Sequence, residues 1–350
     1  MRAFGASELK FLRRLAIEPS LRQVRLAEEL NVSRSAVNQT WRRLEREHGL
    51  RVRGLLDYGK LGIDLVFGWA EISRGGTALR NFSRWLSSSP FVSVTRESMI
   101  SMPMGEKVYF EAVLPRGPHY GRFLNQLVRF QKKPYKLSIV HDRAQQIADH
   151  LSLGLYTGKH WEFDSGFRLQ VSIDGLKDYA DVLPSIRAMR QSEGGIGGIS
   201  ELAVASALEQ EYHVSAGRLQ KFFKEHKLSA PSGRTLRRML ARVRKGVAMP
   251  YVEVKNIALP QQMTVCLRMN PENRALIQLL HAQMGTFPAA RLVSGSELVV
   301  LMLRIPEAAR WDTMTMSLAR SFQQAAEMST FITDSREPRR GLEYILSYIE

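Results

Sequence analysis

The stretch that decides the fold is RQVRLAEELNVSRSAVNQTWRRLEREHG, residues 22–49. Apolar residues recur in its first part at helical spacing, and Asn31 and Val32 then interrupt the pattern. Ser33 stands where a helix N-cap is needed, because its hydroxyl can accept a bond from a free amide of the first turn. A second apolar stripe, which includes Val37 and Leu44, follows on one helical face. The stretch therefore predicts two helices joined by a tight turn.

The second predicted helix carries a polar face that is suited to a DNA major groove. Arginine can bond guanine edges, asparagine and glutamine can bond adenine edges, and serine can bond a base or a phosphate. On an isolated hairpin the same face would be an ordinary solvated surface. We expect base contacts from Ser35, Asn38, Gln39 and Arg42, and phosphate or supporting contacts from Ser33, Arg34, Arg43 and Arg46.

Composition and charge support a polyanionic partner. The chain has 350 residues, 44% of them hydrophobic, and a net charge of +16, which is typical of a globular protein with two or more domains. The positive excess lies almost entirely in residues 1–53 and 213–250, as expected for two phosphate-contacting surfaces. No apolar run has membrane-spanning length and no secretory leader is visible, so we expect a cytoplasmic protein without a membrane.

The sequence offers little sign of catalysis. Its single cysteine, Cys266, excludes an intramolecular disulfide framework and a multi-thiolate zinc site. The eight histidines are scattered singly, and no close ligand pair, Gly-rich phosphate loop or nucleophile elbow is found. We therefore predict no metal, no cofactor and no catalytic residue, and a protein that is not an enzyme.

The rest of the first half predicts a regular order of helices and strands. Residues 7–19 predict a helix that completes a three-helix unit, and residues 50–57 predict a strand pair or wing from which Arg51 and Arg53 could reach phosphates. The order β-α-β-β-α-β then follows, which closes as a split sandwich with helices on one face. Its segments are residues 63–72, 76–89, 91–100, 107–115, 119–133 and 135–140.

A winged helix-turn-helix of the form LAEELNVSRSAVNQTWRRLE, followed by this βαββαβ order, resembles the Lrp/AsnC (feast/famine) family of transcription regulators over residues 7–140. The resemblance implies an α+β fold, with a winged helix-turn-helix and a ferredoxin-like βαββαβ sandwich. It also implies double-stranded DNA as partner, homo-oligomers formed through the sandwich domains, and a small-molecule effector. The hairpin VTRESMISMPMGEKVYFEAVL (94–114) departs from the family's Gly-plus-acid turn, which argues against an amino acid in that role.

The middle of the chain is predicted as a connecting region. Residues 142–154 and 175–190 look helical, residues 161–174 look like a hairpin, and the glycines of 192–198 suggest a flexible joint. Their spacing does not match a dinucleotide-binding fingerprint.

The second half appears as a repeat of the first. Helices are expected at 199–212, 215–227 and 232–246, a wing at 251–256, and β-α-β-β-α-β again from residue 263 to residue 334. We therefore predict five regions, namely 1–57, 58–141, 142–198, 199–256 and 257–350. The second block of DNA contacts would comprise Arg234, Thr235, Arg237, Arg238, Arg242, Arg244 and Lys245.

These patterns together favour a sequence-specific DNA-binding transcription regulator in which one chain acts as a pseudo-dimer. Fold does not fix function, however. Siroheme decarboxylases resemble the same family and act on a tetrapyrrole, so a tetrapyrrole-modifying enzyme is one alternative. A non-specific architectural or RNA-binding protein and a protein-interaction scaffold are the others.

Overall fold

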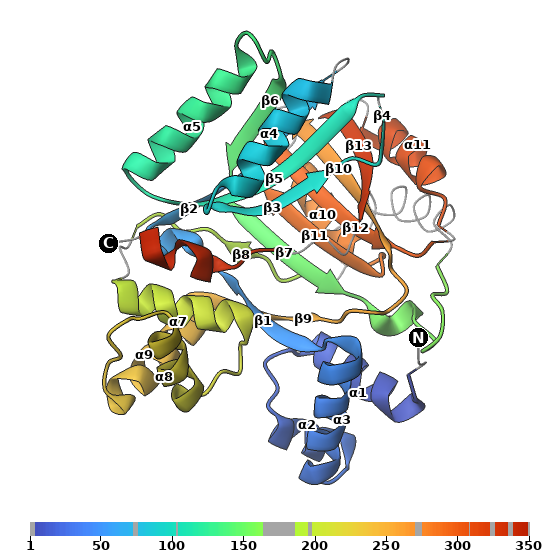
Figure 1. The fold of residues 1–350 in the computed structure, drawn as a ribbon. Helices are drawn as coiled ribbons and strands as arrows, with labels where there is room; N and C mark the ends of the chain where they lie inside the picture. The colour runs from blue at the N-terminus through green and yellow to red at the C-terminus, as the bar shows by residue number, and fades with distance from the viewer. Residues whose placement is uncertain are drawn as a thin grey trace.

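Two β-sheets face each other, and two winged-helix units lie beneath them, in the computed structural model of the chain (Figure 1). Helices cover the outer face of each sheet. The structure describes residues 4–72, 76–102, 104–163, 186–194, 198–269, 275–307, 309–322, 326–334 and 339–348. Within these ranges no helix is both long enough and apolar enough to cross a membrane.

The first winged-helix unit follows the prediction from residues 22–49. Its helices are α1 (Ala6–Ile17), α2 (Gln23–Leu30) and α3 (Arg34–His48). Ser33 caps α3 by accepting a bond from the amide of Ala36 at 3.1 Å. Asn31 adopts the left-handed conformation, with φ of 55°, that lets the chain turn sharply between α2 and α3.

The second winged-helix unit has the same order, with α7 (Ile199–Gln210), α8 (Ala216–Glu225) and α9 (Gly233–Gly246). Ser232 caps α9 through the amide of Thr235, as its place in the sequence predicts. Helix α7 is buried along most of its length because α8, α9, the wing strands and the C-terminal turn η3 (Leu342–Tyr348) all pack against it.

The wing differs from the expected strand pair within residues 50–57. Strand β1 (Arg51–Leu56) pairs with β9 (Ala248–Glu253) of the other winged-helix unit, so the two units share one antiparallel ribbon. The physical reason is local: the chain enters a 3₁₀ turn, η1 (Tyr58–Leu61), directly after β1 and cannot fold back as a hairpin. Strand β1 therefore finds its partner about 200 residues away along the chain.

The first sheet has the strand order β3-β5-β2-β6, with β2 (Ile63–Ile72), β3 (Val92–Glu97), β5 (Glu106–Pro115) and β6 (Ser138–Arg143). Helices α4 (Gly76–Ser88) and α5 (Pro118–Gln131) cover its outer face. The strand expected at 91–100 ends earlier, at Glu97. Beyond it, β4 (Ile100–Met102) leaves this sheet and pairs with a strand of the second one.

The second sheet contains the same strand order, β13-β10-β12-β11, in its centre. Strand β4 extends one edge, and two strands from the middle of the chain extend the other. Helices α10 and α11 pack on the outer face. The bounds are β10 (Gln261–Met269), α10 (Ala275–Met284), β11 (Ala289–Ser294), β12 (Leu298–Ile305), α11 (Trp311–Phe322) and β13 (Ala326–Asp334).

The middle of the chain corrects two sequence predictions. Residues 142–154 are not helical, because β7 (Gln146–Leu151) pairs with β11 at the sheet edge and the turn η2 (Leu153–Leu155) follows it. Residues 189–190 form strand β8, which pairs with β7, and not the end of a helix. The predicted hairpin at 161–174 lies largely outside the described residues, as do residues 175–185 and 195–197 of the predicted helix and joint.

One carboxylate ties the first half of the chain to the second. Asp142 lies one residue before the end of β6, and its Oδ2 accepts bonds from the amides of Glu297 at 2.8 Å and Leu298 at 3.1 Å, where β12 begins. Gly295 lies against this carboxylate, where any Cβ would clash with it. The glycine is therefore required by the close approach of the two sheets.

We expect Asp142→Ala to lower the free energy of unfolding by about 1–3 kcal/mol, because it leaves two backbone amides without their charged acceptor. Urea unfolding measures this change. Asp312→Ala is the matched control, since Asp312, in the first turn of α11, forms an ion pair with exposed Arg310, and it should change stability little. Equal stability of both variants would contradict the tie between the halves.

Candidate functional site

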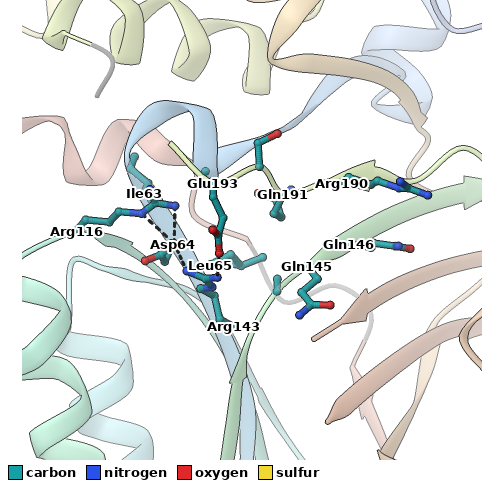
Figure 2. A pocket seen from close by; sticks show the side chains of 13 residues that line it. Ile63, Asp64, Leu65, Arg116, Arg143, Gln145, Gln146, Arg190, Gln191 and Glu193 are labelled. Atoms are coloured by element: carbon teal, nitrogen blue, oxygen red, sulfur yellow. Dashed lines mark hydrogen bonds and ion pairs between the residues drawn. The ribbon is translucent and has the colours of Figure 1, made fainter. Parts of the chain in front are cut away.

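A cleft of about 440 Å³ opens beside the segment that crosses from the first sheet to the second. Its walls come from β2, from the β6–β7 crossing and from β8 with the residues after it (Figure 2). Ile63, Leu65 and Ala144 border it as almost fully buried apolar residues. The polar side chains that line it are Asp64, Arg116, Arg143, Gln145, Gln146, Arg190, Gln191, Ser192 and Glu193.

The acidic groups of the cleft are already engaged by arginine. Two nitrogens of Arg116 donate to Asp64 Oδ1, at 3.2 and 3.1 Å, and Arg143 reaches Glu193 at 2.9 Å and Asp64 at 3.7 Å. Arg190 has no such partner among the residues that the structure describes. The cleft therefore presents one unneutralised guanidinium and the side-chain amides of Gln145 and Gln146, a donor set that suits carboxylates.

The wall of the cleft is fixed by contacts across the chain. Asp57 accepts bonds from the amide and the hydroxyl of Ser192, at 2.9 and 2.6 Å. Gln191 accepts a bond from the amide of Tyr58 and donates to the carbonyl of Leu56. Gly59 packs on the backbone of Ser192 so closely that a Cβ could not fit. These contacts hold residues 191–192 firmly against the start of η1.

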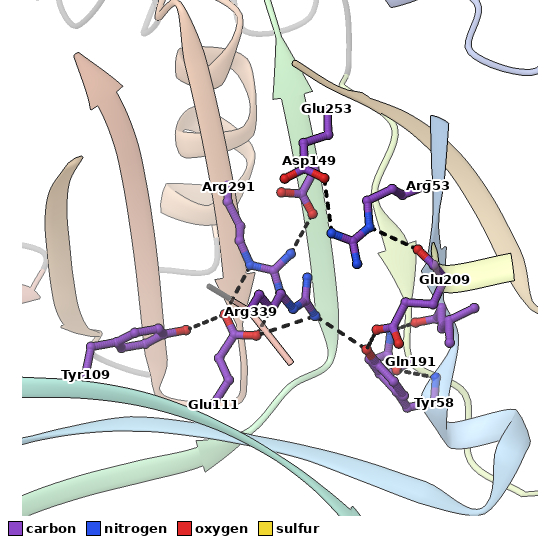
Figure 3. A network of polar contacts seen from close by, with 11 residues as sticks. Arg53, Tyr58, Tyr109, Glu111, Asp149, Gln191, Glu209, Glu253, Arg291 and Arg339 are labelled. Atoms are coloured by element: carbon purple, nitrogen blue, oxygen red, sulfur yellow. Dashed lines mark hydrogen bonds and ion pairs between the residues drawn. The ribbon is translucent and has the colours of Figure 1, made fainter. Parts of the chain in front are cut away.

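A network of charged and phenolic groups lies on the far side of this wall, between the sheets (Figure 3). Arg291 of β11 makes a bidentate pair with Glu111 of β5, at 3.0 and 2.8 Å, and also reaches Asp149 of β7 at 2.5 Å. Tyr109 donates to Glu111 at 3.0 Å, and Arg339 lies 3.7 Å from the same carboxylate. The pair joins one sheet directly to the other.

The network continues to the second winged-helix unit. Tyr58 donates its hydroxyl hydrogen to Glu209 of α7 at 2.8 Å, and Arg339 donates to the Tyr58 oxygen at 3.4 Å. Tyr58 is thus part of the network through its ring and part of the cleft wall through its backbone. The cleft and the network are neighbours, connected by the bond between the Tyr58 amide and Gln191, which lines the cleft.

The wing ribbon closes the network from below. Because side chains alternate along a strand, Val52 and Val252 pack into the apolar core, while Arg53, Tyr251 and Glu253 lie on the opposite face of the ribbon. Arg53 donates to Glu253 at 3.1 Å and to the carbonyl oxygen of Glu209 at 3.1 Å. The polar face of the ribbon is therefore part of the same charged layer.

Burial and charge set the protonation states of this layer. Burial would raise the pKa of Glu111, but the charges of Arg291 and Arg339 outweigh it and lower the pKa to about 2. Burial, and then the neighbouring carboxylates, raise the pKa of Tyr58 and of Tyr109. At neutral pH the carboxylate of Glu111 is ionised and both phenols keep their protons, so each phenol acts as a hydrogen-bond donor.

The residues predicted to contact DNA lie on two separate winged-helix surfaces and do not line the cleft. Most are exposed as expected, on α3, β1 and α9. These are Ser33, Arg34, Ser35, Gln39, Arg42, Arg46, Arg51, Arg234, Thr235, Arg237, Arg238, Arg242 and Lys245, while Asn38 is half-buried.

Three of the predicted phosphate contacts instead hold the protein together. Arg43 pairs with the buried carboxylate of Glu8 at 2.6 Å. Arg53 points into the charged layer, because pairing with β9 turns its face of the wing inward. Arg244 donates to the carbonyl oxygens of Tyr212 and Val214, at 3.1 and 3.0 Å. In addition, Arg242 pairs with Glu201 on the surface.

Sequence reasoning missed the cleft and the charged layer. A usable signal was present in β5 and β11, where Glu111 and Arg291 interrupt strands that are otherwise buried on both faces. A charge in such a strand needs a partner. Among the described residues, no group of three or more histidine, cysteine, aspartate or glutamate side chains could hold a metal ion.

Among known proteins, matches are found with solved structures only. No protein family and no curated protein matches the sequence. The crystal structure of the siroheme decarboxylase NirDL is 12% identical and matches 97% of this chain and 96% of its own, with a TM-score of 0.49. The structure of its complex with an iron-uroporphyrin III analogue is 13% identical and matches 98% of this chain and 96% of its own, with a TM-score of 0.47. An AsnC family transcriptional regulator from Agrobacterium tumefaciens is 18% identical, and the match spans 40% of this chain and 90% of that one, with a TM-score of 0.28.

These matches correct the predicted function. The structures that match along the whole chain are of an enzyme, whereas the regulator matches less than half of it. The prediction of a DNA-binding regulator, and with it the prediction that the protein is not an enzyme, is therefore wrong. The neighbours are mixed helix-and-sheet proteins that include AsnC regulators, which agrees with the coarser fold class expected from the sequence.

The pair between Glu111 and Arg291 predicts an acid-sensitive stability. Because the folded state lowers the pKa of Glu111, its contribution is complete above about pH 4.5 and is lost as the pH falls through about 2. Glu111→Gln should cost about 3–5 kcal/mol of unfolding free energy at neutral pH, since it leaves buried arginine without its main partner.

Urea unfolding between about pH 2.5 and 7 measures this dependence. The difference in unfolding free energy between the wild type and Glu111→Gln should shrink as the pH falls. Glu45→Gln, at an exposed position on α3, is the control and should follow the wild type at each pH. A difference for Glu111→Gln that stays constant with pH would contradict an ionised Glu111.

Proposed function

We propose that the chain is an enzyme that acts on a tetrapyrrole with several carboxylate side chains, and that the substrate binds along the seam between the two sheets. One observation carries the proposal: guanidinium groups from separate elements converge on this seam. Arg143 and Arg190 line the cleft. Arg53, Arg291 and Arg339 lie behind its wall and retain 13–17% side-chain exposure.

The charge of the seam suits such a substrate. Guanidinium groups bind carboxylates at the rim of the ring with two parallel bonds. A cleft of this size would hold one edge of a tetrapyrrole and leave the opposite edge outside. The unpartnered Arg190 is the first candidate to bind a rim carboxylate.

The reaction class that we propose is decarboxylation, as in the enzyme of the full-length structural neighbour. The bond between the carboxyl carbon and its side chain breaks, carbon dioxide leaves, and the electron pair stays on the side-chain carbon. One proton then replaces the lost group. Cations that bind the other carboxylates would hold the ring in place, while apolar surface around the reacting carboxylate would favour the loss of its charge.

The same strand order in both sheets and the same helix order in both winged-helix units support a further part of this proposal, an internal duplication. Each half of the chain contributes a different wall of the seam, namely β2 and β6 from the first half and β11 from the second. The five regions expected from the sequence would then be two pairs and a crossing segment. The crossing segment, at Ala144–Gln146, forms part of the cleft.

Binding of uroporphyrin III, followed by its absorption spectrum, tests the function. Arg190→Met and Arg143→Met should each weaken binding about tenfold, because each removes a charge-assisted hydrogen bond worth about 1.5–3 kcal/mol. Arg84→Met, at an exposed position on α4, is the control and should bind as the wild type does. Incubation with siroheme, followed by mass spectrometry, should show the loss of carbon dioxide.

Two outcomes would overturn the proposal. One is the absence of any spectral change with uroporphyrin III at concentrations well above those of the protein. The other is equal binding by the Arg84, Arg143 and Arg190 variants, which would show that the porphyrin binds elsewhere.

A further inference from the structure

Glu193 places a carboxylate of the protein itself inside the cleft. It follows β8, and its side chain points toward Arg143 of β6 (Figure 2). Glu193 Oε1 accepts a bond from Arg143 Nη2 at 2.9 Å, whereas the ion pair between Arg143 and Asp64 is longer, at 3.7 Å. The guanidinium of Arg143 is therefore occupied mainly by Glu193.

The two partners of this ion pair differ in how firmly they are held. Arg143 is the last residue of β6, and the backbone pairing of β6 with β2 extends as far as this residue. Glu193 keeps 83% of its side-chain surface exposed, although the preceding residue, Ser192, is anchored by Asp57. The carboxylate of Glu193 can therefore turn into solvent by side-chain rotation alone, while the backbone and Arg143 stay in place.

Little is lost when Glu193 turns away. An ion pair with so exposed a carboxylate is weak, because water solvates both groups when they separate. Asp64 stays beside Arg143, but it is shared with Arg116, which donates to it through two nitrogens. Once Glu193 has left, one carboxylate faces two guanidinium groups, and Arg143 is free to bind another carboxylate.

The charge of the cleft decides what can take the place of Glu193. Three arginines and two carboxylates line the cleft, so its lining carries a net charge of +1. A ligand carboxylate that replaces Glu193 at Arg143 leaves this balance unchanged. A neutral group in the same place would leave the guanidinium without its main anion. The ion pair between Glu193 and Arg143 therefore marks a position for a carboxylate.

We infer that Glu193 is a built-in competitor of the substrate, which occupies Arg143 in the empty cleft and is exchanged for one carboxylate of the substrate on binding. This inference rests on the proposed function for the identity of the substrate. The cost of displacing Glu193 lowers the affinity of every ligand that uses Arg143. Weak anions are thereby kept out, whereas a ligand that also binds Arg190 has enough affinity to make the exchange.

The test is a double-mutant cycle of Glu193→Gln and Arg143→Met, with uroporphyrin III as the probe and its absorption spectrum as the readout. Glu193→Gln should bind the porphyrin about two- to fivefold more tightly than the wild type, because the competing carboxylate is gone. In the Arg143→Met background the same substitution should change binding little. Glu45→Gln removes one negative charge at an exposed position of α3 and should bind as the wild type does.

Two results with uroporphyrin III would overturn the inference and leave the proposed function in place. One is an affinity of Glu193→Gln that is unchanged or weaker than that of the wild type. The other is an equal gain in both backgrounds, which would show that the charge of Glu193 acts without occupying Arg143.

If the wild type binds no porphyrin, the proposed function fails and glutarate, a small dicarboxylate, becomes the probe. Glutarate should then raise the melting temperature of Glu193→Gln by more than that of the wild type. This difference should vanish in the Arg143→Met background. Equal stabilisation of the wild type and Glu193→Gln, or stabilisation of neither, would overturn the competitor as well.

Discussion

The bidentate pair between Glu111 and Arg291 is the interaction on which the remaining structure depends. Here buried charges of opposite sign join the two sheets directly, in addition to apolar packing. Because both groups are buried, neither can be left alone without a large desolvation cost. Asp149, Tyr109 and Arg339 therefore gather around the pair, and the layer between the sheets becomes polar at this end.

This polar layer explains how the other parts of the chain are placed. Arg339 comes from the C-terminal segment, whose next residues pack against α7, and Glu209 of α7 accepts bonds from both Tyr58 and the amide of Leu342. The second winged-helix unit is thus attached to the sheets by polar contacts as well as by its core. The wing ribbon then covers the layer from below. A fold that looks like a DNA-reading architecture uses its wings for internal support.

The secondary structure was largely predictable, because apolar periodicity and caps are local signals. Ser33 and Ser232 mark the starts of α3 and α9, and most strands of both sheets appear near their expected bounds. The failures have a common cause. Strand β7 reads as a helix because only its pairing with β11 makes it a strand, and β1 reads as half of a hairpin because its partner lies in the other winged-helix unit.

The candidate site was harder to predict than the fold for the same reason. The cleft combines residues of β2, β6, β7 and β8, and no short motif connects them. Arg53 shows the difficulty most clearly. Its sequence context is that of a phosphate-binding wing, and only the register between β1 and β9 turns it toward Glu253. Charge in a sequence shows that a partner exists, whereas the direction of a side chain depends on distant pairing.

The shared ribbon also has a consequence for synthesis. Arg51 pairs with Glu253, so β1 leaves the ribosome long before its partner strand has been made. During that interval it is an unpaired strand edge, which is open to pairing with another nascent chain. Closing so long a loop is also slow compared with forming the local helices. The first three helices can fold early, but the register of the wings is decided only after about 70% of the chain has emerged.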